Sequence, residues 1–266
     1  MSDPQSPAGR PASRTWSPEL YLRFEEQRSR PARDLLAQVG QRAPAHVVDL
    51  GCGPGNSTQL LAERWPTARI VGTDTSAKML AAARLRLPEA TFELGDIAGW
   101  TPPEQTDVVF ANAVFQWVPD HLAHLARILG ALRPGATLAI QVPDNLDEPS
   151  HRLMRTVAEL PAFAADLSFV KRAPIHPVRT YFEALQPLAR TVDVWHTAYN
   201  HVLDGAGAIV EWVRGTGLGP YLEPLDPARR ELFLAEYRAR IADAYPAMRD
   251  GRVILRFPRL FIVATK

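Results

Sequence analysis

The stretch from residue 46 to residue 142 alternates between strand-like and helix-like patterns, and this alternation restricts the chain to few folds. Short apolar runs predict strands at 46–50, 69–74, 91–96, 107–113 and 136–142. Apolar residues at helical spacing predict helices over about 57–64, 77–86 and 120–132. Strands and helices that take turns in this way form a parallel sheet with helices on both faces. We therefore expect an α/β protein with a doubly wound sheet.

The alternation ends after residue 142. Two further strand patterns, at 191–199 and 252–265, predict an antiparallel pair that completes a mostly parallel seven-stranded sheet. Helical segments at about 15–39, 143–188 and 203–250 are expected to form a cap over one end of that sheet. Residues 1–14 are rich in Pro, Ser, Ala and Gly and predict a disordered tail. A single domain is therefore expected over 15–266.

Charge and composition exclude several classes of partner. The 30 basic and 29 acidic residues give a net charge of +1, which favours neither nucleic acid nor an anionic membrane. No apolar stretch is long enough to span a bilayer, and the first residues contain no signal-like apolar segment. We expect a cytoplasmic protein that is a monomer or a weak oligomer. Cys52 is the single cysteine, and His121 and His124 are joined by no other strong ligand, so no metal is expected.

A glycine-rich segment, DLGCGPGN, follows the first predicted strand at residues 49–56. In open parallel sheets ligands bind beyond the carboxyl ends of strands, and Gly51, Gly53 and Gly55 would let the backbone approach a ligand closely. The dinucleotide pattern G-x-G-x-x-G requires a glycine where Asn56 stands, and no G-K-[ST] ending is present. The loop therefore matches neither a dinucleotide site nor a P-loop.

The charge of Asp49 narrows the choice of ligand further. A carboxylate at this strand end would face the pyrophosphate of a dinucleotide, and two unit charges about 4 Å apart repel by about 4 kcal/mol at an effective dielectric of about 20. A ligand that carries an ammonium and a sulfonium, and no phosphate, turns this repulsion into attraction. S-adenosylmethionine has that charge pattern.

Three further strand ends supply groups for the rest of this ligand. Asp74 is placed to accept hydrogen bonds from both ribose hydroxyls, and Asp96 from the adenine amino group, with Ile97 against the ring. Asn112 and Ala113 would lie beneath the methionine part. Each acid also has a structural alternative: Asp49 could hold the loop, Asp74 could cap the next helix, and Asp96 could sit in a turn. The predicted cofactor-binding residues are Asp49, Gly51, Gly53, Gly55, Asn56, Asp74, Asp96, Ile97, Asn112 and Ala113.

With these motifs in view, the chain resembles class I S-adenosylmethionine-dependent methyltransferases over about residues 16–265. The general motifs are DLGCGPGNST, GTD and GDI. More specific motifs resemble those of the trans-aconitate 2-methyltransferase family: RSRPARDLL (28–36), ANAVFQWVPDH (111–121), QVPDN (141–145), EPSHRLMR (148–155), VRGTGL (213–218) and FPRLFIVA (257–264). The resemblance implies a Rossmann-like fold and methyl transfer to one carboxylate of trans-aconitate, which yields a monomethyl ester and S-adenosylhomocysteine.

A carboxylate acceptor makes particular demands on the site. It is already ionised at neutral pH, because its reference pKa is near 4, so no general base is expected. What remains is to align the oxygen with the methyl group, exclude water and hold a trianion, which calls for arginines. Arg28 and Arg30 lie between two predicted N-terminal helices, the second opened by Pro31, while His151 and Arg155 are four apart and share a helix face. The predicted substrate-binding residues are Tyr21, Arg28, Arg30, Trp117, His151, Arg155 and Arg259.

Three alternatives remain open from the sequence. A methyltransferase of the same fold could act on a phenol or an amine, which would usually need a base. A non-catalytic binder of S-adenosylmethionine would need no sealed pocket for an acceptor. A nicotinamide dehydrogenase is disfavoured by Asp49 and Asn56.

Overall fold

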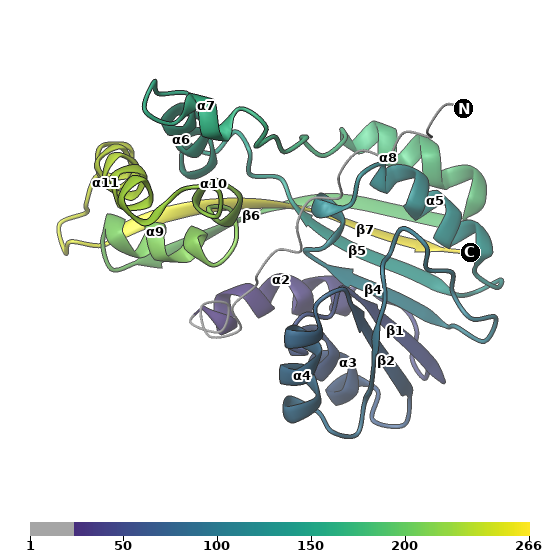
Figure 1. Ribbon diagram of the computed structural model, residues 1–266. Coiled ribbons are helices and arrows are strands. Elements are labelled where there is room, and N and C mark those ends of the chain that lie inside the picture. Colours follow the sequence, from purple (N-terminus) through teal and green to yellow (C-terminus); the bar gives the residue numbers. More distant parts are fainter. Residues whose placement is uncertain (1–23) are drawn as a thin grey trace, which may run out of the picture.

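The sheet is the centre of the computed structural model, which describes residues 24–266 (Figure 1). Its strands are β1 (His46–Leu50), β2 (Arg69–Asp74), β3 (Thr91–Leu94), β4 (Val108–Asn112), β5 (Thr137–Pro143), β6 (Thr191–Leu203) and β7 (Val253–Thr265). They form one seven-stranded sheet in the order β3-β2-β1-β4-β5-β7-β6, in which β7 alone runs opposite to the other strands. The predicted fold class is confirmed. The predicted disordered tail at 1–14 lies outside the described residues.

Strand order reverses between β1 and β4. The chain runs from β1 outward to β3 and then returns to pair β4 with β1, with Val47 opposite Val108 and Asp49 opposite Phe110. The loop after β1 and the segment after β4 therefore leave the sheet side by side, at the place where open α/β sheets bind ligands.

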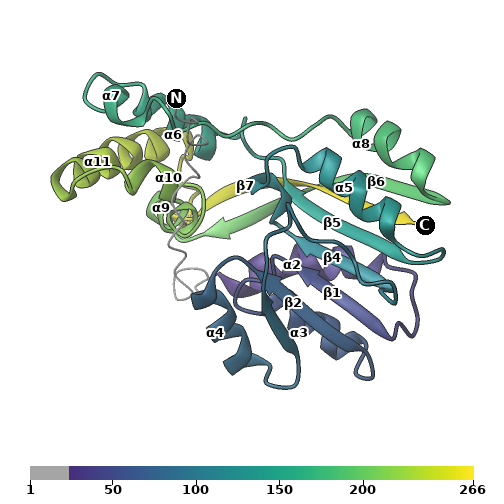
Figure 2. The same cartoon turned by 45° about the vertical axis from the view of Figure 1, so that its right-hand side comes forward.

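Two layers of helices cover the sheet. Helices α2 (Glu25–Ala37) and α3 (Asn56–Arg64) pack on one face, and α5 (His121–Ala131) and α8 (Val178–Leu185) pack on the other (Figure 2). Alternate residues of β4 separate the two cores: Phe110 packs with Leu35 and Leu61, while Val109 packs with Leu125. Helix α4 (Ala77–Arg86) packs against β2 and β3.

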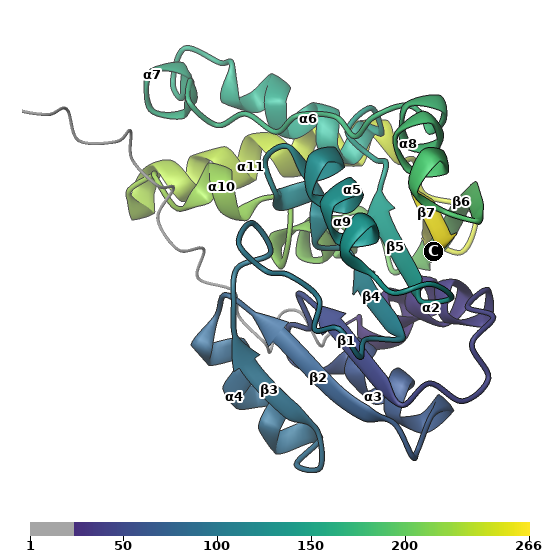
Figure 3. The same ribbon diagram turned by 90° about the vertical axis from the view of Figure 1, so that its right-hand side faces the viewer.

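A cap of helices surrounds the far ends of β6 and β7 (Figures 1 and 3). It contains α6 (Pro149–Ala158), α7 (Ala164–Leu167), α9 (Ala206–Arg214), α10 (Gly219–Leu222) and α11 (Pro227–Ala244). Trp212, Phe233, Tyr237 and Leu255 form the centre of its own buried cluster. Helix α11 contacts both α6 and α9, so segments far apart in sequence share this core.

Two segments that the sequence assigned to the cap pack on the sheet instead. Tyr181 and Leu185 of α8 are completely buried against α5 and the strands, and the second half of α2 buries Leu35 against β1 and β4. The prediction that Pro31 opens a second helix was also wrong, because α2 continues through Pro31 as one helix. Within residues 24–266, no helix combines the length and apolarity needed to cross a membrane.

Candidate active site

The glycine loop, residues 51–55, is shaped by three glycines with positive φ that differ in what surrounds them. A Cβ on Gly51 (φ 68°) would lie 2.4 Å from the Val114 side chain, and one on Gly55 (φ 89°) would lie 3.3 Å from Ala83. A Cβ on Gly53 (φ 54°) would meet nothing within 4 Å. Gly51 and Gly55 therefore serve packing, and only Gly53 turns toward space that a ligand can fill.

Asp49 lies beneath this loop and is fully buried. Its Oδ2 accepts hydrogen bonds from Ser57 Oγ and Thr58 Oγ1, both at 2.7 Å, while Oδ1 has no hydrogen-bond partner in the described part of the chain. Burial raises the pKa of Asp49 to about 7. A buried carboxyl of this kind is ionised more readily when a positive charge binds nearby.

Asp74 braces the glycine loop from the end of β2. Its Oδ2 accepts from the Gly53 backbone N–H and its Oδ1 from the Ser76 N–H, both at 2.9 Å. Burial raises the pKa of the Asp74 carboxyl. The cap of α4 is Ser76, whose Oγ accepts from the Met79 N–H at 3.3 Å, so Asp74 is not the capping residue.

The other predicted cofactor residues occupy different positions around the loop. Asp96 is exposed and accepts from the Ala98 N–H at 3.0 Å, as in a turn, while Ile97 is buried. Asn56 begins α3, and its Nδ2 donates to Glu25 of α2 at 2.6 Å. Asn112 is the last residue of β4 and Ala113 follows it, and both line a cavity beside the loop.

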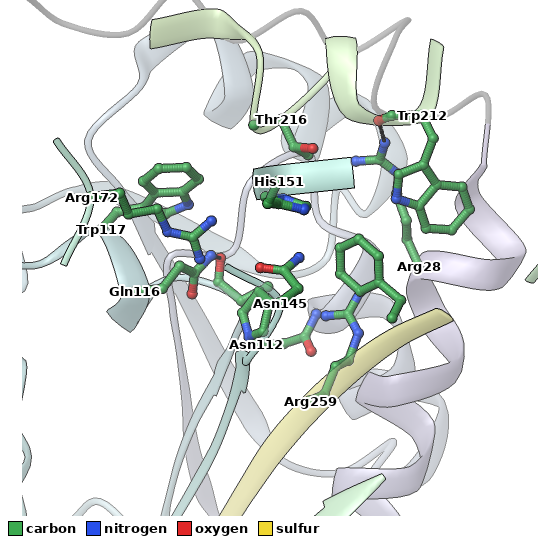
Figure 4. Close-up of a pocket in the computed structure, with 14 residues that line it drawn as sticks. Arg28, Asn112, Gln116, Trp117, Asn145, His151, Arg172, Trp212, Thr216 and Arg259 are labelled. Carbon is green, nitrogen blue, oxygen red and sulfur yellow. Dashed lines mark hydrogen bonds between the residues drawn. The ribbon is translucent and has the colours of Figure 1, made fainter. Parts of the chain in front are cut away.

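This cavity, which we call the cap pocket, lies between the ends of β4 and β5 and the cap. Figure 4 shows side chains from α2, α6, α9, β7 and the segments after β4 and β5 around it. Its lining includes Arg28, Arg172 and Arg259, and no aspartate or glutamate among the described residues. The described lining therefore carries three positive charges.

The three arginines enter the pocket from different parts of the chain (Figure 4). Arg28 of α2 is 7% exposed, and its Nη2 donates to the Trp212 carbonyl at 2.8 Å. Arg259 of β7 is 5% exposed, and its Nη1 donates to Gln141 Oε1 at 2.9 Å. The Arg172 guanidinium lies over the Trp117 ring, 4.7 Å from its centroid. Planar guanidinium groups held in this way suit carboxylate recognition.

Amide groups line the part of the pocket next to β4. Asn112 Oδ1, Gln116 Oε1 and Asn145 Oδ1 are buried and have no hydrogen-bond partner in residues 24–266. Gln116 Nε2 donates to the carbonyl of Ala113 at 2.6 Å, and Ala113 itself has a φ of 57°, which is unusual for a residue with a side chain. Buried oxygens normally have a partner, so this lining is suited to a polar or cationic ligand group.

His151 of α6 is the pocket's one histidine among the described lining residues. Its Nδ1 lies 3.1 Å from Ser150 Oγ. Burial, with the charges of Arg172 and Arg155, lowers the pKa of His151 to about 3. The imidazole is therefore neutral and a very weak base near pH 7.

The structure brings together four of the predicted substrate-binding residues: Arg28, Trp117, His151 and Arg259. Arg30 does not line the pocket; it is exposed and lies over the Tyr199 ring, at 5.3 Å. Residues two apart on one helix point in different directions, and the continuous α2 places Arg28 and Arg30 in that relation.

Arg155 and Tyr21 complete the predicted set. Arg155 shares a face of α6 with His151 but lies one turn further along, where its Nη2 is 3.9 Å from Asp147 Oδ1. A shift of four residues moves a side chain about 6 Å along a helix axis, enough to leave a small pocket. Tyr21 lies outside the described residues.

Several pocket residues were not predicted. Gln116 and Asn145 stand inside motifs that the sequence analysis quoted, next to Trp117 and at the end of QVPDN, so their position after strand ends was an available signal. Thr216 also stands inside a quoted motif, VRGTGL, whereas Arg172 lies outside regular elements and outside every quoted motif.

The two histidines considered for a metal have other surroundings. His121 Nε2 lies 2.6 Å from the Tyr181 hydroxyl, and His124 Nδ1 lies 3.4 Å from Arg127. Over the described residues, no group of three or more His, Cys, Asp or Glu side chains could hold a metal ion.

Comparison with known proteins places the fold in a class. A family model described as a methyltransferase domain matches residues 47–135. The fold matches the YcgJ protein of Bacillus subtilis, with a TM-score of 0.57 and 14% identity over 88% of this chain and 97% of that one. It also matches phosphoethanolamine N-methyltransferase 2 of Haemonchus contortus in complex with S-adenosylhomocysteine, with a TM-score of 0.53 and 16% identity over 88% of this chain and 52% of that one. The fold is that of class I methyltransferases.

Relatives close in sequence define the family within that class. The trans-aconitate 2-methyltransferase of Afipia carboxidovorans is 57% identical over 94% of this chain and 99% of its own length. That of Sinorhizobium fredii is 57% identical over 95% of this chain and 99% of its own. The chain belongs to the trans-aconitate 2-methyltransferase family, as the motifs predicted.

Proposed function

We propose that this protein transfers a methyl group from S-adenosylmethionine to one carboxylate of trans-aconitate and so forms its monomethyl ester. The observation that carries the proposal is the charge of the cap pocket: Arg28, Arg172 and Arg259 line it, and no described lining residue is acidic. A tricarboxylate with three negative charges matches these three positive charges. The names of the close relatives support the same acceptor.

Residues around the glycine loop fit the methyl donor. When bound, S-adenosylmethionine supplies a methyl group on a positively charged sulfur and leaves as S-adenosylhomocysteine. Asp49, with its unpartnered Oδ1, provides negative charge beneath the loop, and the open side of Gly53 allows close approach of the backbone. The unpartnered Asn112 Oδ1 provides a further acceptor at the end of β4.

We assign the donor to a band of residues along these strand ends. Asp74 would accept from the ribose, and Asp96 and Ile97 would contact the adenine. Asn112 and Ala113 would lie beneath the methionine part, because both residues line the cap pocket and so mark where donor and acceptor meet. Gly51, Gly55 and Asn56 would shape the loop.

The chemistry of the cap pocket favours a carboxylate over a phenol or an amine. The described lining offers no aspartate, glutamate, tyrosine, cysteine or lysine, and His151, with a pKa lowered to about 3, is too weak a base to take a proton from a phenol or an ammonium group. A carboxylate needs no proton removed. The work of this chain's residues is to orient the acceptor oxygen, hold its other carboxylates and exclude water, and orientation alone can contribute roughly 7–11 kcal/mol.

A direct assay tests the proposal. The purified protein is incubated with labelled S-adenosylmethionine and, separately, with trans-aconitate, cis-aconitate, citrate, a phenol and a primary amine, and the products are identified by mass spectrometry. We expect a single added methyl on trans-aconitate. Methylation of the phenol or amine alone would overturn the assignment of the acceptor, and donor binding without turnover of any acceptor would favour a non-catalytic binder.

The pH profile gives a second readout. Without a general base, kcat at saturating donor and acceptor should stay within about twofold from pH 6.5 to 9. A rise of about tenfold per pH unit over part of that range would indicate that a base removes a proton from the acceptor.

A further inference from the structure

Arg172 stands in a segment without regular structure between α7 and α8. Near its start, Val170 packs against the cluster inside the cap, and near its end, Ile175 packs against the cluster between the sheet, α5 and α8. The 170–176 segment therefore spans from the cap to the sheet, and Arg172 points into the cap pocket between these two anchors (Figure 4).

A chain of hydrogen bonds holds the second anchor. The backbone N–H of His176 donates to the Tyr181 hydroxyl at 3.4 Å, and that hydroxyl lies 2.6 Å from His121 Nε2. The side chains of His121 and Tyr181 are buried, that of Tyr181 completely. The rings of His176 and Tyr181 also meet edge to face, with centroids 5.7 Å apart.

The direction of these bonds follows from the partners. The Val118 backbone acts to raise the pKa of His121, as an acceptor of a hydrogen bond from the imidazole does. Since Nε2 faces Tyr181, Nδ1 is the nitrogen left to donate to Val118, and Nε2 is the acceptor. Tyr181 then donates to His121 and accepts from His176, so the direction of both hydrogen bonds is defined.

Burial and the surrounding charges keep this arrangement near neutral pH. Burial, followed by the proximity of His176, lowers the pKa of His121, while Asp120 opposes that shift and His124 adds to it. Burial raises the pKa of Tyr181 to about 12, with Asp144 acting in the same direction. The imidazole thus stays neutral and the hydroxyl keeps its proton.

Both ends of this chain of hydrogen bonds lie close in sequence to residues that line the cap pocket. Val118 directly follows Trp117, which lines the pocket, and His176 is four residues after Arg172. Arg172 in turn lies over the Trp117 ring, 4.7 Å from its centroid. The bonds through His121 and Tyr181 therefore link the backbone beneath Trp117 to the segment that carries Arg172.

We propose that His121 and Tyr181 are positioning residues for acceptor binding: through His176 they hold the 170–176 segment so that Arg172 stays over Trp117 and faces an acceptor carboxylate. This proposal rests on the proposed function. It makes the affinity for a carboxylate acceptor depend on a hydroxyl and an imidazole that do not line the cap pocket themselves.

The first test is a double-mutant cycle between Tyr181→Phe and Arg172→Ala. Tyr181→Phe removes only the hydroxyl, and we expect the acceptor KM to rise by about three- to tenfold, with kcat and donor affinity within about twofold of wild type. In the Arg172→Ala background the same change should have little further effect, because the guanidinium it positions is gone. Equal factors in both backgrounds would overturn the proposal, as would an unchanged KM.

Variants of His121 test the direction of the bonds. His121→Gln keeps an acceptor for the Tyr181 hydroxyl and should retain most of the wild-type KM, whereas His121→Leu should resemble Tyr181→Phe. His124→Gln, on the same helix but bonded to Arg127, is the matched control and should change nothing. If Gln and Leu at position 121 behave alike, the hydrogen bond is not what matters.

Hydrogen exchange separates this proposal from the proposed function. Without any acceptor present, the amides of residues 170–176 should exchange faster in Tyr181→Phe than in wild type, while cap helix α11 stays protected. Faster exchange in an enzyme that methylates no tricarboxylate would leave the link intact and defeat the proposed function. Unchanged exchange in an active enzyme would defeat the link alone.

Discussion

The donor end and the acceptor end of this molecule are built in different ways. Around the glycine loop, the groups assigned to the donor come from consecutive strand ends between residues 49 and 113, and the open side of Gly53 leaves the backbone accessible. Around the cap pocket, Arg28, Arg172 and Arg259 come from positions more than 80 residues apart. Local pattern determines the first arrangement, and only the packing of the cap against the sheet determines the second.

This contrast predicts that substitutions can weaken donor binding and acceptor binding separately. The largest effect is expected for Arg259→Gln. Arg259 is buried beside Gln141 and lines the cap pocket. Losing two charge-assisted hydrogen bonds to a carboxylate, together about 3 kcal/mol, should lower kcat/KM for the acceptor by about 100-fold. Donor affinity, measured by calorimetry, should change by less than about threefold.

The matched control is Arg256→Gln on the same strand. Arg256 is exposed and pairs with Glu148, outside the pocket lining. Surface pairs contribute about 0–1 kcal/mol, so its kinetics should stay close to wild type. If Arg259→Gln weakened donor and acceptor binding equally, the separation of the two ends would be lost.

Asp49→Asn should give the next largest effect, at the donor end. The amide still accepts from Ser57 and Thr58 but carries no charge. Donor affinity should fall by about 10- to 100-fold at pH 8, with the acceptor KM little changed. Arg259→Gln and Asp49→Asn would then form a reciprocal pair.

The pH dependence of donor binding sharpens the role of Asp49. Its pKa is raised to about 7, so its ionised fraction, and with it the attraction for a cationic donor, grows as pH rises through that value. Wild-type donor affinity should increase by about tenfold from pH 6 to pH 8 and then level off, while Asp49→Asn should show no such rise. A wild-type affinity independent of pH would remove the electrostatic argument for this site.

Without donor, the contribution of Asp49 to folding stability should fall as pH rises, whereas donor affinity rises. The folded pKa of Asp49 lies above its ordinary value, so the contribution of this group to stability is fully present below about pH 4 and is lost as pH rises through about 7. Above pH 7, donor binding should therefore offset part of this lost stability.

The same contrast explains what the sequence could predict. Strands β1 and β2 and helix α4 have the predicted bounds because an apolar run or a helical period is a local property. The candidates Asn112 and Ala113 were predicted in the same way, from the end of a strand pattern. By contrast, β6 runs four residues beyond its predicted end at 199. Its last residues lie in the cap, where they pair with β7 as far as Leu203 opposite Val253.

The cap pocket was only partly predictable for the same physical reason. Arg172 lies in an irregular segment, and its place over Trp117 depends on contacts with two separate cores. Arg30 was predicted together with Arg28 because both were expected between two helices, and only the continuity of α2 through Pro31 shows that the two side chains diverge. Spacing along the chain thus predicted which types of residue the site uses better than it predicted where each side chain points.

A pair of glycine variants should produce smaller effects that differ in kind. Gly51→Ala places a methyl group 2.4 Å from Val114 and should destabilise the fold by about 2–4 kcal/mol, visible as a lower Tm. Gly53→Ala meets only open space, so its stability cost should be about 1–2 kcal/mol from the positive φ alone. Its donor affinity should nevertheless fall by about tenfold, because the methyl would occupy the space assigned to the donor. Normal donor affinity in Gly53→Ala would place the donor elsewhere.

The smallest effects are expected for Arg155→Ala and Arg30→Ala, the two predicted substrate residues that the fold directs away from the cap pocket. Arg155 is 3.9 Å from Asp147, and Arg30 is exposed over Tyr199, so each should act on the acceptor only through screened, long-range charge. The acceptor KM should rise by less than about threefold at 0.15 M salt, and Arg155→Ala should have the larger effect of the two because its charge reaches His151. Raising the salt should remove most of that difference. A loss for Arg155→Ala as large as that for Arg259→Gln would mean that α6 turns this side chain inward when the acceptor binds, and the cap would then be a moving part of the site.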